Sequence, residues 1–110
     1  MAYDEILADR MRQVLADQDG LSEKSMFGGR AFLIHGHMAA AASGQGAILL
    51  RVNPAEADRL VDGVSVTRMV MRGREMNGWL RVSVDRVDTE DDLHEWLNHG
   101  VAFVRSLPPK

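Results

Sequence analysis

The sequence predicts an α+β fold: an antiparallel sheet of about six strands with helices at the N-terminus, in the middle and at the C-terminus. Two observations lead to this prediction. Apolar residues recur every three or four positions at both ends of the chain, as in amphipathic helices. Between the ends, short apolar runs are separated by tight glycine-containing turns, whereas parallel strands would need long crossovers. The expected order is α-β-β-β-β-α-β-β-α.

The first helix is predicted close to the N-terminus. Charged residues fill the face opposite its apolar stripe, and Gly20 is a plausible stop. The apolar stripe consists of Tyr3, Ile6, Leu7, Met11, Val14 and Leu15.

Four strands joined by tight turns are predicted after Gly20. The dipeptides Gly28-Gly29 and His35-Gly36 provide the positive φ that a hairpin needs. The third strand is rich in alanine and carries no charge, so it would be a poorly guarded edge if it lay outermost. The strands are expected over residues 22–27, 30–34, 37–42 and 47–52.

The second half of the chain is predicted to form a short helix, two strands and a long helix. Asn53-Pro54 marks the start of the short helix, with asparagine as the N-cap. Asp88 or Thr89 caps the last helix, and Pro108-Pro109 ends it. The two strands are expected over 66–71 and 79–84, with a loop or wide hairpin from Gly73 to Gly78.

Length and composition limit the classes of protein. The 110 residues fit one domain over 1–110, and the absence of cysteine excludes disulfides, thiolate metal sites and cysteine catalysis. A net charge of −3 disfavours autonomous nucleic-acid binding. The charged N-terminus does not resemble a signal peptide, and no apolar run is long enough to span a membrane. We therefore expect a cytoplasmic protein.

The sequence offers no pattern for a metal, a cofactor or catalysis. His35 and His37 share a face but have no third ligand nearby, and His94 and His99 are five apart on a helix and so lie on different faces. No serine occupies a nucleophile elbow, and the glycines match no phosphate-binding motif. We expect a protein that is not an enzyme and needs no cofactor. A small ligand-binding protein or enzyme of unknown chemistry stays open as an alternative.

Arginines on the predicted fifth and sixth strands give a further alternative. Arg68, Arg72 and Arg74 fall on alternate positions, and Arg81 on the next strand is expected to share their wet face. Such a ribbon is able to contact phosphates, which would make the chain a nucleic-acid-binding module. The simpler interpretation is a set of arginines that flank the sheet.

Seven methionines are many for this length, and they serve either as core filler or as an adaptable interaction surface. Together with the alanine-rich strand, the pair Met69 and Met71 favours self-association as a two-fold dimer. The methionines in or beside predicted strands are Met26, Met38, Met69, Met71 and Met76.

Five stretches are informative when taken together: AYDEILADRMRQVL, EKSMFGGRAFLIHGHM, LLRVNP, MRGREMNGWLRV and WLNHGVAFVRSLPPK. In this order and spacing they resemble the N-terminal domain of the TfoX/Sxy family of competence regulators, from Tyr3 to Lys110. The most specific pieces are Met26-Phe27-Gly28-Gly29, the pair Gly78-Trp79, and the segment from Phe103 to Lys110.

The resemblance implies an α+β domain with a link to transcriptional control of DNA uptake, working with other regulators. It supplies no catalytic residue. Longer members carry a helical C-terminal domain, and we expect this chain to be a stand-alone version. The expected function is a regulatory or protein-interaction domain, whose unknown protein partner belongs to the transcription machinery. We expect Phe27 to anchor the first hairpin in the core and Trp79 to cover the sheet, both structural roles.

Overall fold

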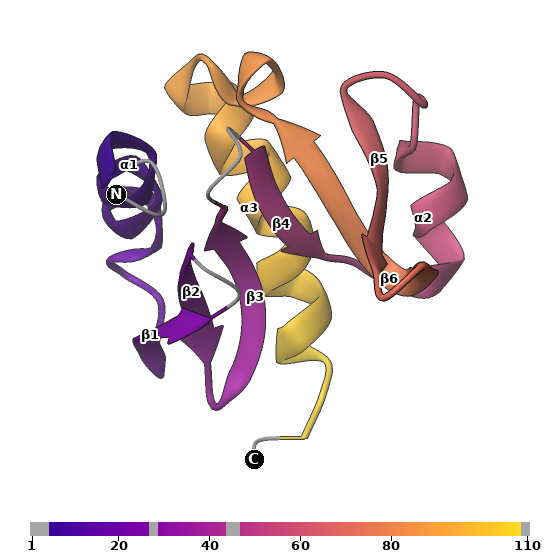
Figure 1. The fold of residues 1–110 in the computed structure, drawn as a ribbon. Helices are drawn as coiled ribbons and strands as arrows, with labels where there is room; N and C mark the ends of the chain where they lie inside the picture. Colours follow the sequence, from indigo (N-terminus) through magenta and orange to yellow (C-terminus); the bar gives the residue numbers. More distant parts are fainter. Residues whose placement is uncertain (1–4, 27–28, 44–46, 109–110) are drawn as a thin grey trace.

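The computed structural model describes residues 5–26, 29–43 and 47–108, and it confirms the predicted α+β class and order of elements (Figure 1). A short 3-10 helix, η1 (Val84–Val87), precedes the last helix and was not predicted. The helices are α1 (Glu5–Leu15), α2 (Pro54–Leu60) and α3 (Glu90–Arg105). The strands are β1 (Leu21–Met26), β2 (Gly29–Ile34), β3 (His37–Ala42), β4 (Ala47–Arg51), β5 (Val66–Met71) and β6 (Arg74–Ser83).

The six strands form one sheet in the order β1-β2-β3-β4-β6-β5, and every neighbouring pair is antiparallel. Strand β6 therefore lies between β4 and β5, although β5 precedes it in the chain. Strand β3 lies inside the sheet, between β2 and β4, so the idea of an alanine-rich edge is wrong. The edges of the sheet are β1 and β5.

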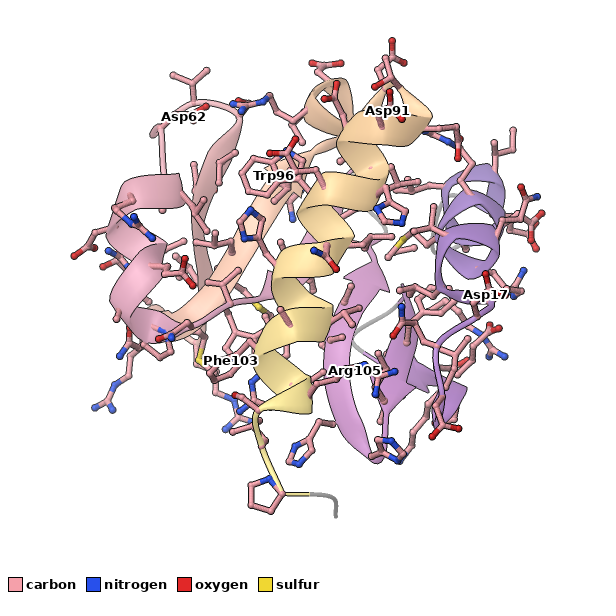
Figure 2. The ribbon with its side chains drawn as sticks, turned by 180° about the vertical axis from the view of Figure 1, so that it is seen from behind. Asp17, Asp62, Asp91, Trp96, Phe103 and Arg105 are labelled. Carbon is pink, nitrogen blue, oxygen red and sulfur yellow. The ribbon has the colours of Figure 1, made fainter. Side chains whose placement is uncertain are left out.

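The main core fills the space between the sheet and the helices. Strands β3 and β4 lie in front of α3 in Figure 1, and Figure 2 shows α3 from the opposite side. Side chains from α1, α3 and the strands form one apolar cluster. Its largest fully buried side chains include Met11, Leu15, Phe32, Ile34, Ile48, Leu50, Leu80, Leu93 and Leu97.

Helix α3 packs unusually close to the middle of the sheet. A Cβ atom added at Gly100 would lie 2.7 Å from the carbonyl oxygen of Ala39 and 3.1 Å from that of Arg51. The alanines of β3 are fully buried, and their small side chains leave room for this approach. The alanine run is thus explained by packing in the centre of the sheet.

The predicted helix caps and one predicted turn are confirmed. The side chain of Asn53 accepts a hydrogen bond from the Ala55 amide at 3.0 Å, and that of Thr89 accepts from the Asp92 amide at 3.1 Å. The turn between β2 and β3 has positive φ angles at the dipeptide His35-Gly36.

The β5–β6 hairpin differs from the prediction of a loop from Gly73 to Gly78. Its turn consists only of Arg72 and Gly73, whose φ angles are 54° and 77°. The irregularity lies further along β6, because Val70 pairs with Glu75 whereas Arg68 pairs with Leu80. Strand β6 therefore carries a wide bulge before Leu80. The bulge is not predicted from the sequence because apolar and polar residues do not alternate within it.

An ion-pair cluster ties α1 to the first two strands. Both carboxylate oxygens of Glu23 accept hydrogen bonds from Arg12, at 2.6 and 2.8 Å, and one also accepts from Arg30 at 3.0 Å. These bonds, that from Arg12 foremost, lower the pKa of Glu23 from its ordinary 4.5 to about 2. Glu23 is therefore ionised over the whole physiological range.

Candidate functional site

The face of the sheet that points away from α1 and α3, here called the open face, carries a second apolar cluster. Its members come from strands β2 to β6, and none of them comes from a described helix. The outer layer of the cluster is half-buried and consists of Leu33, Met76 and Trp79. Beneath it lie the buried residues Ala31, Met38, Ala41, Leu49 and Met69.

The strand register assigns these side chains to the open face. Leu49 pairs with Ala41 on one side and with Arg81 on the other, whereas its neighbours Ile48 and Leu50 point into the main core. An antiparallel sheet with one free face normally carries polar side chains there. The apolar character of the open face is therefore a feature that calls for a functional explanation.

Three cations border this cluster. Lys24 pairs with Ala31 across the sheet, Arg81 pairs with Leu49, and Arg51 pairs with Trp79. Among the described residues that the register places on the open face, none is acidic. The open face thus combines an apolar centre with a positively charged border.

Arg51 connects the open face to the end of α3. Its guanidinium group lies 5.6 Å from the ring centroid of Trp79 and 5.4 Å from that of Phe103. Both distances suit cation–π contacts, which hold the Trp79 ring in place. Trp79 is half-buried rather than buried, so it both covers the sheet as predicted and stays accessible.

The structure separates the four arginines that the sequence grouped together. Arg68 lies opposite Leu80, on the face of the main core, and forms an ion pair with Asp58 of α2. Arg81 points to the open face instead, so the expectation that it shares a face with Arg68 is wrong. The reason is that Arg81 directly follows the core residue Leu80, and neighbouring residues of a strand point to opposite faces. Arg72 and Arg74 are exposed at the hairpin turn.

The glycines of the predicted motifs have structural roles where they are described. A Cβ atom at Gly29 would collide with the carbonyl oxygen of Ala42 on β3. Gly78 has a φ of 82°, and its carbonyl accepts a hydrogen bond from the Val52 amide at 2.8 Å. Phe27, Gly28 and the side chain of Met26 lie outside the described residues.

A second surface, here called the α2–α3 groove, was not predicted from the sequence. It consists of two adjoining hollows of about 400 and 350 Å³ between α2 and α3, which share Glu95 and His99. Figure 2 shows Trp96 and Phe103 on the side of α3 that faces α2. The spacing of Trp96, His99 and Phe103 in the sequence is the available signal, because residues three and four positions apart lie on one side of a helix.

The described residues do not point to a metal site or a membrane span. No group of three or more histidines, aspartates or glutamates lies close enough together to hold a metal ion in the part of the chain that the structure describes. No helix within the described ranges is long and apolar enough to cross a membrane.

Comparison with known families gives a match over most of the chain. A model described as the TfoX N-terminal domain matches residues 13–104. The chain belongs to the TfoX N-terminal domain family. The matched region reaches from within α1 to the last turn of α3, so it contains the open face and all residues of the α2–α3 groove except Ser106. The family resemblance predicted from the sequence is confirmed, and a search of curated proteins finds no match.

Proposed function

We propose that this TfoX N-terminal domain is a cytoplasmic, non-catalytic protein-interaction domain that acts in transcriptional regulation and binds its partner through the open face. The observation that carries the proposal is the second apolar cluster, whose outer layer no described helix covers. Apolar surface that is rimmed by polar groups is typical of protein–protein contact sites.

The residue types of the outer layer suit such a contact. Trp79 offers a large ring, of the kind that dominates binding energy in interfaces. Met76 is flexible and polarizable, so it adapts to the shape of a partner. The buried layer beneath them, which includes Leu49 and Met69, gives these side chains a firm base.

The charges around the cluster indicate the chemistry of the partner. Arg51, Arg81 and Lys24 give the open face a positive border, so an apolar partner surface with acidic residues at its edge fits best. Membership of the family supports the regulatory class, because the resemblance implies transcriptional control together with other regulators.

The nucleic-acid alternative has less support. The proposed arginine ribbon is divided between two faces, and Arg68 is already paired with Asp58. The net charge of −3 also opposes contact with phosphates. Binding to generic duplex DNA with an affinity that falls steeply with salt would favour this alternative instead.

Site-specific photo-crosslinking in source cells tests the proposal. A photoreactive amino acid at Leu33 or Met76 samples the outer layer, and the same amino acid at Ile6, an apolar α1 residue that is 76% exposed, is the matched control. We expect one defined protein adduct from the open-face positions and not from Ile6.

A charge substitution completes the experiment. Leu33→Glu is expected to abolish the adduct formed at Met76, because it places an acid in the apolar layer, while the protein still melts cooperatively. Ile6→Glu is expected to leave the adduct unchanged. Adducts that form equally at all positions, or that survive Leu33→Glu, would contradict the assignment of the open face.

A further inference from the structure

The α2–α3 groove has an aromatic floor. Trp96 and His99 lie with their ring centroids 5.7 Å apart, and Phe103 follows one turn further along α3. Trp96 and Phe103 are only half-buried, whereas Leu97 and Val101 on the other side of the helix are buried in the core. Part of this aromatic surface therefore stays accessible in the groove, although Arg86 lies over the Trp96 ring and Arg51 over the Phe103 ring.

The walls of this groove are acidic. Both of its arginines are engaged: Arg59 pairs with Glu56 at 2.8 Å, and Arg86 pairs with Asp62 at 2.8 Å and lies over the Trp96 ring. The three remaining carboxylates of the groove form no ion pair with any described residue. They are Asp85, Asp92 and Glu95.

The tip of the β5–β6 hairpin has the complementary character. Arg72 and Arg74 are exposed, and neither forms an ion pair within the described residues. Arg74 pairs with Met71 and lies on the same side of β6 as Met76, whereas the exposed acid Glu75 pairs with Val70 on the opposite side of the hairpin. The two-residue turn through Gly73 keeps the tip narrow.

The hairpin and the groove lie on the two sides of one short helix. The ion pair between Arg68 and Asp58 ties strand β5 to one side of α2, while Glu56 and Leu60 line the groove on the other side. Figure 1 shows β5 and β6 beside α2. These positions are compatible with a two-fold axis next to α2 that brings each hairpin to the groove of the other copy.

We infer that two copies of this chain form a two-fold dimer in which the β5–β6 hairpin of each copy docks into the α2–α3 groove of the other. In this dimer Arg72 and Arg74 face the acidic wall of the groove. The inference does not rest on the proposed function, because the contact at the hairpin tip does not use the apolar cluster of the open face or its border of Lys24, Arg51 and Arg81. It also differs from a dimer through an alanine-rich edge strand, which is excluded because β3 lies inside the sheet.

Light scattering over a wide concentration series tests the dimer. We expect twice the chain mass of 12.2 kDa at high protein concentration and the single-chain mass on dilution. The variant Arg72→Glu/Arg74→Glu and the variant Asp92→Lys/Glu95→Lys should each weaken association about tenfold or more, since like charges then meet. Combining the four substitutions in one chain should restore association, because the charges are then exchanged.

Two controls match these charge changes elsewhere on the molecule. Lys24→Glu alters the open face. Asp17→Lys alters the turn after α1, and Figure 2 shows Asp17 on the side of α3 opposite to α2. Neither should affect association. In Trp79→Phe, Trp96 becomes the single tryptophan of the chain, and its emission should shift to the blue as the dimer forms.

Clear results would overturn the inference. A mass of 12.2 kDa at every concentration excludes the dimer. A dimer that tolerates both double charge reversals, or that Lys24→Glu weakens equally, excludes the contact between hairpin and groove. An unchanged Trp96 emission in a dimer leads to the same conclusion.

Discussion

Replacing Gly100 by alanine is expected to destabilise the protein, although alanine is the better helix former. Gly100 lies inside α3, where alanine would gain about 1 kcal/mol of helix propensity. The added Cβ atom would, however, lie 2.7 Å from the carbonyl oxygen of Ala39 and 3.1 Å from that of Arg51. Both oxygens belong to the backbone of the sheet and are unable to move aside like a flexible side chain.

The balance of these two effects gives the expected loss of unfolding free energy. Overfilling a packed core costs about 1–3 kcal/mol, and contact with backbone atoms places Gly100→Ala in the upper part of that range. After the gain in propensity is subtracted, the net loss of unfolding free energy is about 1–2 kcal/mol. For a chain of this length, the melting temperature should fall by roughly 5–10 °C.

Thermal and denaturant unfolding of two variants would measure both effects. Ala102→Gly, at an exposed position of the same helix, reports the propensity effect alone and should cost about 1 kcal/mol. If Gly100→Ala melts at the same temperature as the parent protein or higher, α3 does not approach the sheet as closely as described and the reasoning fails.

Three further predictions concern single side chains. Glu23→Gln should destabilise the protein at neutral pH. Because the pKa of Glu23 is lowered, the difference in unfolding free energy between this variant and the parent should shrink as the pH falls from 4.5 towards 2. A difference that stays constant in urea titrations at acid pH would contradict this. Thr89→Ala removes the N-cap of α3 and should cost about 1 kcal/mol by denaturant unfolding, and an unchanged midpoint would show that the cap is dispensable. Trp79→Ala should lower the free energy of unfolding by roughly 2 kcal/mol, less than the 3–5 kcal/mol expected for a fully buried ring, because the ring is half-buried. A larger loss would place the ring in the core.

Local chemistry explains which parts of the fold were predictable. The caps at Asn53 and Thr89 and the turn at His35-Gly36 depend on residues next to one another, so the sequence pattern reports them directly. The order of strands depends on pairing between distant segments, and the placement of β6 between β4 and β5 leaves no local signal.

The candidate surfaces were less predictable for the same reason. Alternation in the sequence showed that Leu80 and Arg81 point to opposite faces, but it did not show which face holds Arg68. That answer requires the register across the bulge of β6. The methionines were noted in the sequence, yet only the sheet order brings Met38 of β3 and Met69 of β5 into one cluster.

The insertion of β6 between β4 and β5 also sets the order in which the protein is able to fold. Strands β1 to β4 pair with their neighbours in the chain, so this meander needs only short loop closures. The pairing of β4 with β6 encloses α2 and β5, and α3 covers β3 only when the last segment is made. During synthesis Ala39, Ala40 and Ala42 of β3, which belong to the main core, therefore stay without the cover of α3 until that helix has left the ribosome. Pulsed hydrogen exchange should accordingly show amide protection in β2 and β3 only once α3 has docked.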